Sequence, residues 1–137
     1  MCLVCADKSE GGVKRVLVID DEPSVADALR VILEDEGFAV EVARSGREGM
    51  EQARRAGFRV TITDLRLPDM NGLEVICAFR EGGVGGSLIL ITSHGTPEIF
   101  SLALDLGAVN VIAKPFRPSE ILQLVTAALT GRESCAP

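Results

Sequence analysis

The sequence contains no tryptophan and no tyrosine, and aromatic residues make up 4% of the chain. Proteins that bind single-stranded nucleic acid stack bases on such side chains, so an aromatic platform for bases is excluded. Positive charge is also scarce, because 14 lysines and arginines stand against 20 acidic residues and leave a net charge of −6. Direct contact with DNA or RNA requires a basic surface that neutralises phosphates, and this balance argues against it.

Long apolar stretches are missing as well. No apolar run approaches the ~18 residues of a membrane span, and a run such as 88–91 fits a buried strand. The start of the chain lacks the basic segment and the long apolar core of a secretory signal. We therefore expect a cytoplasmic protein without membrane insertion.

Histidine occurs once, at His94, and cysteine occurs four times. Thiols in a cytoplasmic chain are expected to be reduced. Cys2 and Cys5 have the spacing of half a zinc site, but no second Cys/His pair accompanies them. We interpret them as thiols on a loose tail. Cys77 falls in an apolar pattern of helical period and is predicted to be a small core residue.

The remaining composition, 47% hydrophobic and 25% charged over 137 residues, is typical of one globular domain. We divide the chain into a flexible tail over 1–12, a domain over 13–130 and a C-terminal tail over 131–137. Strands are predicted at 16–19, 38–43, 60–63, 88–91 and 109–113. Helices are predicted from Pro23 towards Gly37 and at 46–55, 73–80, 97–106 and 119–129.

Strands and helices thus alternate strictly along the domain. This order predicts an α/β fold with a parallel sheet and helices on both faces, because parallel strands need crossover helices. Ligands bind such sheets outside the carboxyl ends of the strands, where the strand order switches. The polar residues at the strand ends are therefore the candidate site.

The predicted strand ends carry carboxylates, hydroxyls and one ammonium group: Asp20, Asp21, Asp64, Thr92, Ser93 and Lys114. Crowded acids repel one another unless a cation neutralises them, and an all-oxygen cluster suits Mg²⁺. Together these groups are the parts for phosphoryl transfer onto an aspartate. Each residue alone has a plainer interpretation, such as Asp21 as a helix N-cap. Their joint occurrence at the ends of separate strands favours the site.

Four stretches of the chain resemble the receiver domains of bacterial two-component response regulators. They are residues 16–24, 63–72, 91–95 and 107–116, and they occur in the family's order. The resemblance covers about residues 13–130 and implies a flavodoxin-like, doubly wound sheet of five strands in the order 2-1-3-4-5.

The resemblance also implies a metal site and a phosphoacceptor. Asp64 resembles the phosphoacceptor. Asp21 looks like a direct ligand of Mg²⁺, and Asp20 looks like a ligand acting through water. The backbone carbonyl of Arg66 completes the implied ligand set.

Further roles are implied beside that set. Thr92 resembles the hydroxyl that swings towards the phosphoryl group, and Lys114 resembles the lysine of the family. Lys114 precedes Pro115 in a peptide bond that is typically cis in these domains. Arg66 and His94 occupy places that tune the lifetime of the acyl phosphate, with His94 expected at the rim of the pocket.

The implied function is that of a phosphoacceptor charged by a sensor histidine kinase or a phosphotransfer protein. Such a domain catalyses its own phosphoryl transfer and dephosphorylation and is otherwise not an enzyme. Phosphorylation is expected to switch a surface formed by the helix at 97–106, the strand at 109–113 and the helix at 119–129. The expected partner is a downstream protein or a second copy of the chain, without nucleic-acid contact.

Two departures from the family pattern leave alternatives open. Val111 stands where an aromatic residue often turns inward on activation, which puts coupling through such a side chain in doubt. Leu102 and Leu124 widen the apolar faces of their helices, which indicates either a partner surface or a thicker core. The sequence leaves open whether the chain is a stand-alone receiver or a fragment of a longer regulator.

Three rival functions fit parts of this pattern. A constitutive binding module would keep the fold without phosphorylation. A nucleotide- or flavin-binding enzyme would need a glycine-rich phosphate loop after the first strand, where this chain has acids. An aspartate-dependent phosphatase would need two acids spaced Asp-x-Asp at one strand end, whereas Asp20 and Asp21 are adjacent.

Overall fold

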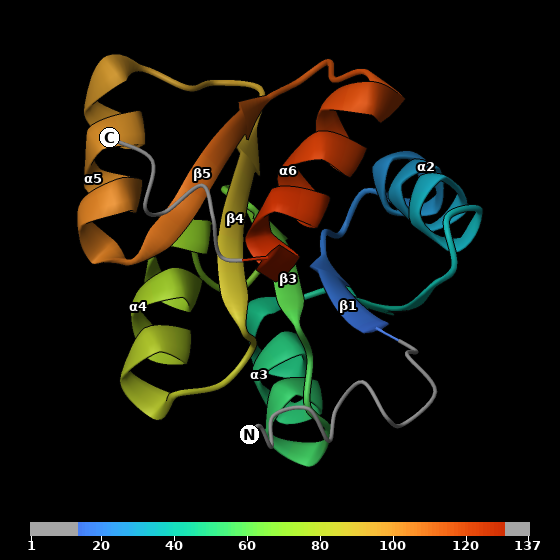
Figure 1. Ribbon diagram of the computed structural model, residues 1–137. Helices are drawn as coiled ribbons and strands as arrows, with labels where there is room; N and C mark the ends of the chain where they lie inside the picture. Colours follow the sequence, from blue (N-terminus) through green and yellow to red (C-terminus); the bar gives the residue numbers. More distant parts are fainter. Residues whose placement is uncertain (1–13, 131–137) are drawn as a thin grey trace.

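The computed structural model describes residues 14–130 as five strands and five helices (Figure 1). The strands are β1 (Lys14–Ile19), β2 (Phe38–Ala43), β3 (Val60–Asp64), β4 (Ser87–Thr92) and β5 (Ala108–Ala113). The helices are α2 (Pro23–Glu34), α3 (Gly46–Arg55), α4 (Gly72–Gly82), α5 (Pro97–Leu106) and α6 (Pro118–Thr130). Every predicted element is present, with ends that move by a few residues. The predicted tails over 1–12 and 131–137, with Cys2 and Cys5, lie outside the described residues.

All five strands form one parallel sheet in the order β2-β1-β3-β4-β5. This confirms the flavodoxin-like, doubly wound arrangement. The order switches at β1 and β3, which are hydrogen-bonded neighbours although β2 lies between them in the sequence. The carboxyl ends of β1 and β3 therefore lie side by side at the edge where ligands bind in such sheets.

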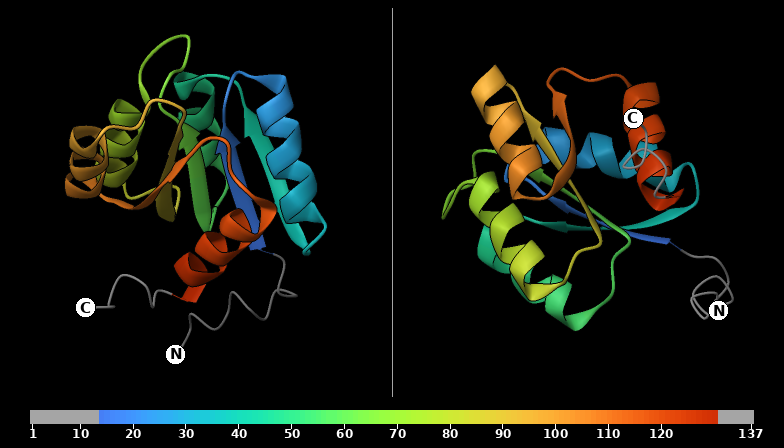
Figure 2. Two further views of the ribbon diagram at one scale, coloured as in Figure 1. Left: turned by 90° about the horizontal axis from the view of Figure 1, so that it is seen from above. Right: turned by 60° about the vertical axis from the view of Figure 1, so that its left-hand side comes forward.

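Helices cover both faces of the sheet, with α2 and α6 on one face and α3, α4 and α5 on the other (Figure 2). Strand β1 packs against the helices on both faces of the sheet. Val16 and Val18 pack with α2 and α6, whereas Leu17 and Ile19 pack with the other three helices. All four side chains are fully buried, which is why this strand is a continuous aliphatic run.

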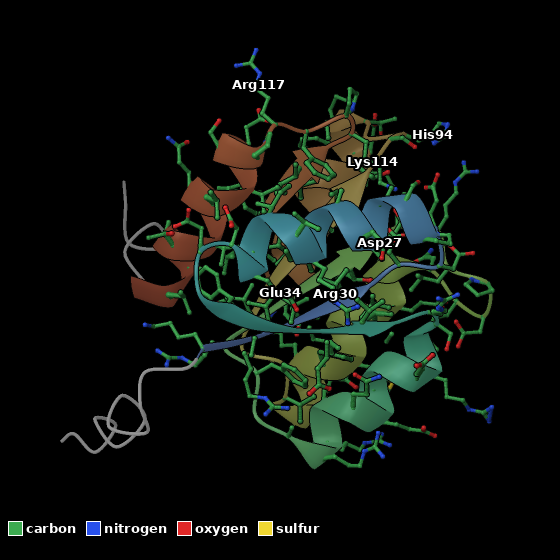
Figure 3. The ribbon with its side chains drawn as sticks, turned by 90° about the vertical axis from the view of Figure 1, so that its right-hand side faces the viewer. Asp27, Arg30, Glu34, His94, Lys114 and Arg117 are labelled. Atoms are coloured by element: carbon green, nitrogen blue, oxygen red, sulfur yellow. The ribbon has the colours of Figure 1, made fainter. Side chains whose placement is uncertain are left out.

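Helix α2 starts at Pro23 as predicted, but Asp21, which alone could have been read as its N-cap, does not occupy the N-cap position. Glu22 is the N-cap residue of the helix but makes no hydrogen bond through its side chain. The acids before this helix are therefore not used for capping. On its outer face α2 carries an exposed ion pair, with Arg30 Nε 3.6 Å from Glu34 Oε2 (Figure 3).

Cys77 is half-buried on α4, and its Sγ lies 3.8 Å from Glu81 Oε2. The prediction of a core position was wrong, because the buried side of the helix is formed by Val75, Ile76 and Phe79, with Cys77 beside it. Within residues 14–130 none of the helices has the length and apolar character needed to cross a membrane.

Candidate functional site

The carboxyl edge of the sheet gathers the candidate residues from four strands. Asp20 directly follows β1, and Asp64 is the last residue of β3. Thr92 ends β4, and Lys114 directly follows β5. One carboxylate oxygen from each of Asp20, Asp21 and Asp64 lies within 4.8 Å of the other two. The predicted convergence of acids is thus present in the folded chain.

Lys114 lies at the centre of this acidic group. Its Nζ is 3.2 Å from Asp64 Oδ1 and 3.6 Å from Asp20 Oδ2. It is also 3.6 Å from Glu22 Oε1, a contact that the sequence analysis missed. Only the position of Glu22 next to two acids could have suggested it. The backbone N–H of Lys114 donates to the Thr92 carbonyl at 2.8 Å and ties the ends of β4 and β5 together.

Asp20 is a buried carboxylate, and only one of its two oxygens accepts a hydrogen bond from the described residues. Its Oδ1 accepts a hydrogen bond from the Glu22 backbone N–H at 2.9 Å. Its Oδ2 is buried without a hydrogen-bond partner among the described residues. Burial raises the pKa of Asp20 to about 6, an effect that the Glu22 N–H and Lys114 reduce and the charge of Asp64 increases.

Asp64 and Lys114 also have shifted pKa values. Burial raises the pKa of Asp64, although the charge of Lys114 opposes this effect. Burial alone would lower the pKa of Lys114, but the three carboxylates around it outweigh burial and raise that pKa. Lys114 is therefore a permanently charged ammonium, and it does not fully compensate the carboxylates.

This donor set fits a divalent cation. Mg²⁺ prefers carboxylate, carbonyl and water oxygens and binds through few protein ligands. The clustered carboxylate oxygens and the orphaned Asp20 Oδ2 supply such ligands. A cation there would supply the positive charge that the buried acids lack. No nitrogen or sulfur ligand joins this cluster of described residues, which favours a hard cation over zinc.

Thr92 is buried, and its Oγ1 accepts a hydrogen bond from the His94 backbone N–H at 3.0 Å. His94 itself is exposed at the rim of the site, with Nδ1 3.2 Å from Ser93 Oγ. Both His94 and Lys114 lie at the same end of the molecule (Figure 3). The peptide bond between Lys114 and Pro115 is cis, as the resemblance implied.

The loop between β3 and α4, residues 65–71, closes the other side of the site. Arg66 lies on it, is exposed and pairs with Asn71 in an isolated antiparallel bridge. Gly72 follows, and its N–H donates to the Leu65 carbonyl at 2.6 Å. A methyl group on Gly72 would collide with the carbonyl oxygen of Asp64. Glycine therefore allows the loop to fold back against the strand that carries Asp64.

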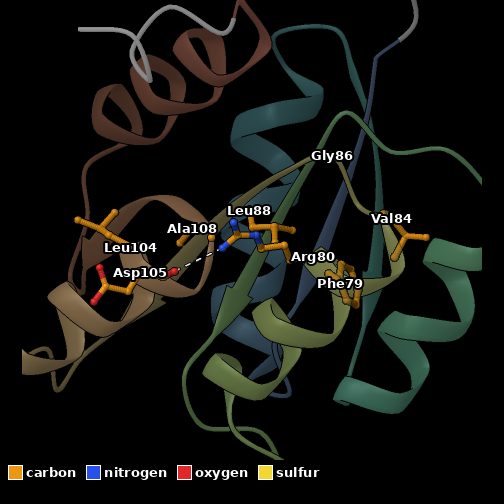
Figure 4. A pocket seen from close by; sticks show the side chains of 10 residues that line it. Phe79, Arg80, Val84, Gly86, Leu88, Leu104, Asp105 and Ala108 are labelled. Atoms are coloured by element: carbon orange, nitrogen blue, oxygen red, sulfur yellow. Dashed lines mark hydrogen bonds between the residues drawn. The ribbon is translucent and has the colours of Figure 1, made fainter. Parts of the chain in front are cut away.

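A cavity of about 490 Å³ opens over this edge. It is lined by residues of the 65–71 loop, by residues that follow β1 and β4, and by strand ends, including Asp21, Asp64, Arg66, Thr92 and Lys114. A larger cavity of about 700 Å³ lies at the opposite end of the sheet, between α4 and α5 (Figure 4). Its charged lining residues are Arg80 and Asp105, and Arg80 Nη1 donates to the Asp105 carbonyl at 3.4 Å. The smaller cavity is the candidate site, because it contains the gathered acids.

A doubly wound sheet with clustered acids, a hydroxyl and a lysine at its carboxyl edge is the arrangement expected of a receiver-type signalling domain. A sequence profile described as the response regulator receiver domain matches residues 16–126. The chain belongs to this family.

Known relatives agree in sequence and in structure. The chain is 33% identical over 120 residues to the DNA-binding response regulator MtrA of Mycolicibacterium smegmatis, covering 88% of this chain and 52% of MtrA. A CheY-like receiver domain protein from Methanospirillum hungatei superposes with a TM-score of 0.81 at 31% identity, covering 90% and 99% of the two chains. The beryllofluoride-activated NtrC4 receiver domain dimer gives 0.83 at 33% identity, covering 87% and 98%.

The chain spans about half the length of the curated relatives it matches. Receiver domains act in two-component signalling and are signalling proteins rather than enzymes in the ordinary sense. They generally bind Mg²⁺ at an acidic pocket, and they interact with histidine kinases or phosphotransfer proteins. Some of them dimerise.

Proposed function

We propose that this chain accepts a phosphoryl group on Asp64, with Mg²⁺ held by Asp20, Asp21, Asp64 and the backbone carbonyl of Arg66. One observation carries this assignment: Lys114 Nζ lies 3.2 Å from Asp64 Oδ1 within a cluster of three carboxylates. Such an ammonium can hold a phosphoryl oxygen as a point charge once Asp64 is modified. The phosphoryl donor is a phosphohistidine on a histidine kinase or phosphotransfer protein.

Asp64 is the nucleophile of the proposed reaction. One of its carboxylate oxygens forms a bond to phosphorus while the phosphorus–nitrogen bond of the donor breaks, and that electron pair leaves with the imidazole. Bound Mg²⁺ supplies positive charge that offsets the charge on the phosphoryl oxygens. Lys114 remains protonated throughout, because its neighbouring carboxylates raise its pKa.

Thr92 is placed to sense the product. Its Oγ1 accepts from the His94 N–H, so the hydroxyl proton is available to a phosphoryl oxygen. If this hydroxyl rotated towards Asp64, it would lose the hydrogen bond from the His94 N–H and donate one to the phosphoryl group. The start of the loop that leads to α5 would then shift. The signal then passes from the site to that helix.

The acyl phosphate is removed by water in the second half of the cycle. Water attacks phosphorus, the bond from phosphorus to the Asp64 oxygen breaks, and inorganic phosphate leaves with the carboxylate restored. Arg66 and His94 both line the cavity, and their side chains control how much water reaches the phosphoryl group. We place this cycle in the cytoplasm.

The output surface of the proposed switch is formed by α5, β5 and α6. Leu102 and Leu104 on α5 are 45% and 51% exposed, which favours a protein-binding surface over a thicker core. Leu124 on α6 packs instead against the core shared with α2. The surface would take a downstream protein or a second copy of this chain. Val111 on β5 is half-buried on the α3, α4 and α5 side of the sheet and, being aliphatic, contributes no aromatic switch.

The assignment is tested by intact mass spectrometry after incubation with acetyl phosphate. Wild type is expected to gain one phosphoryl group in the presence of Mg²⁺ and none with EDTA. Asp64→Asn is expected to gain none under either condition. Asp27→Asn, a change of an exposed acid on α2, is the matched control and should react as wild type does. An unmodified wild type after a rapid quench would instead favour a constitutive binding module.

A further inference from the structure

The loop over residues 65–71 needs a fixed position, because it brings the Arg66 carbonyl to the metal site under the proposed function. Within the loop, Leu67 N–H donates to the Met70 carbonyl at 3.2 Å, and Arg66 pairs with Asn71. These contacts close the loop on itself. They do not determine where it lies relative to Asp20 and Asp21, which come from another strand.

Asp69 links this loop to the start of α3, more than twenty residues earlier in the chain. Its Oδ1 accepts from the Gly46 N–H and its Oδ2 from the Arg47 N–H, both at 2.9 Å. A carboxylate that accepts two backbone N–H groups at a helix start forms charge-assisted hydrogen bonds and opposes the positive end of the helix dipole. The Arg47 and Gly46 N–H groups accordingly hold the pKa of Asp69 below its ordinary value.

The start of α3 does not need Asp69 for its own N-cap. Ser45 is the N-cap residue, and its side chain accepts from the Glu48 N–H at 3.1 Å. Asp69 takes the two N–H groups that Ser45 does not reach. An apolar contact adds to the link, because the Met70 side chain lies directly over Gly46 and leaves no room for a larger residue there.

Helix α3 in turn packs on the strand that leads to the acids. Gly49 of α3 lies directly against the side chain of Ile19, the last residue of β1, which precedes Asp20. A continuous set of contacts therefore runs from the 65–71 loop through α3 to the end of β1. The two sources of metal ligands are thereby held at a set separation.

We propose that Asp69 is a positioning residue: by binding the start of α3 it holds the 65–71 loop, and with it the Arg66 carbonyl, in place for the cation. The inference rests on the proposed function, since it concerns the same metal site. Asp69 itself touches neither the cation nor the phosphoryl group. Its loss weakens cation binding without changing any of the clustered carboxylates.

The test compares Asp69→Ala with Ser45→Ala by calorimetric titration of the full chain with Mg²⁺. Both variants remove a cap from the same end of α3, but only the first releases the loop. Asp69→Ala is expected to raise the Mg²⁺ dissociation constant by roughly ten-fold, as loss of an outer partner of a metal ligand typically does. Ser45→Ala is expected to keep the wild-type dissociation constant.

Phosphorylation by acetyl phosphate gives a second readout. Asp69→Ala should react slowly at limiting Mg²⁺ and recover the wild-type rate at saturating Mg²⁺. Asp69→Asn, which keeps one accepting oxygen, should fall between Asp69→Ala and wild type, and it replaces Asp69→Ala if that variant does not fold.

Two outcomes would overturn the inference while leaving the proposed function intact. One is a wild-type Mg²⁺ affinity in the Asp69 variants, which would make Asp69 a helix cap alone. The other is an equal loss of affinity in Ser45→Ala, which would assign the effect to the stability of α3. Failure of the wild type itself to bind Mg²⁺ would overturn the proposed function and this inference together.

Discussion

The interior of the sheet and its carboxyl edge are buried to a similar degree, but by side chains of opposite chemistry. Leu17 and Ile62 in the interior are fully buried and apolar. Asp20 and Asp64 at the edge are 1% and 7% exposed and are carboxylates. In the interior, burial stabilises the fold, since apolar surface leaves water. At the edge, burial opposes ionisation, so the group there is costly to the fold until a cation binds.

This difference predicts that the two regions respond differently to substitution. Interior side chains contribute to the free energy of unfolding through packing, and their loss leaves cavities. Edge carboxylates are expected to lower the free energy of unfolding in the metal-free protein, because burial raises the pKa of Asp20 and of Asp64. Substitutions in the two regions test this contrast.

The largest loss is expected from the interior. Phe79 on α4 is fully buried against the α3, α4 and α5 side of the sheet. Phe79→Ala removes that packing and should lower the free energy of unfolding by about 3–5 kcal/mol. Urea denaturation followed by circular dichroism measures it. A loss below about 1 kcal/mol would mean that this interior is not closely packed.

A gain in stability is expected at the edge. In EDTA at neutral pH, Asp20→Asn should raise the free energy of unfolding by up to about 3 kcal/mol. Folding raises the pKa of Asp20 from 3.8 to about 6, and each tenfold rise in proton affinity costs the folded, ionised protein about 1.4 kcal/mol. The same variant should bind Mg²⁺ more weakly. A loss of stability in Asp20→Asn would show that the ion pair with Lys114 outweighs burial.

The pH dependence of that gain has a definite sign. Folded Asp20 holds its proton up to about pH 6, whereas the unfolded chain releases it near the ordinary value of 3.8. The metal-free wild type should therefore lose stability as pH rises between these two values. Asp20→Asn should lack this part of the slope. Thermal unfolding in EDTA at several pH values between 4 and 8 compares the two proteins.

Gly72 lies where interior and edge meet, and its substitution should affect both. The methyl group of Gly72→Ala would collide with the Asp64 carbonyl oxygen and displace the 65–71 loop. We expect a loss of about 1–3 kcal/mol, typical of overpacking, and slower phosphorylation by acetyl phosphate. Gly82→Ala, at the exposed end of α4, is the control, because its methyl group would make only an ordinary contact with Val84, and it should leave the phosphorylation rate unchanged.

The smallest change in stability is expected on the outer face of α5. Leu102 is 45% exposed, so Leu102→Ser should alter the free energy of unfolding by less than about 0.5 kcal/mol. Leu90→Ala, at a fully buried position, should lose about 2–5 kcal/mol. Sedimentation of the phosphorylated proteins would show whether Leu102→Ser weakens self-association. A large loss of stability in Leu102→Ser would place this leucine in the core.

Much of the fold and of the candidate site was predictable from local patterns. Continuous aliphatic runs such as 16–19 identify strands covered on both faces, and the acids and lysine directly after strands identify the edge. These signals depend on residues that are close together in the sequence, so they can be detected without knowledge of the fold. The prediction of a core position for Cys77 was wrong because the residues next to it in the sequence are also apolar. A helical pattern then does not show how wide the buried side of the helix is.

Other features of the site depend on contacts between distant segments. Asp69 and Gly46 are 23 residues apart, and nothing near either residue indicates that they are hydrogen-bonded. The ion pair between Glu22 and Lys114 likewise joins the first strand end to the last. Leu102 on α5 is exposed, whereas Leu124 on α6 is half-buried against the core, although the sequences of the two helices look equally apolar.

The sequence by itself determined the alternation of strands and helices, and with it a parallel sheet whose strand ends carry oxygen ligands and a lysine. Tertiary structure alone decided that Asp20 is buried with one oxygen that accepts no hydrogen bond from the described residues, that Lys114 reaches three carboxylates, and that Asp69 bonds to the start of α3. The reason is physical. Periodicity is a local property of the chain, whereas desolvation and charge interactions depend on distances that exist only after the strands assemble.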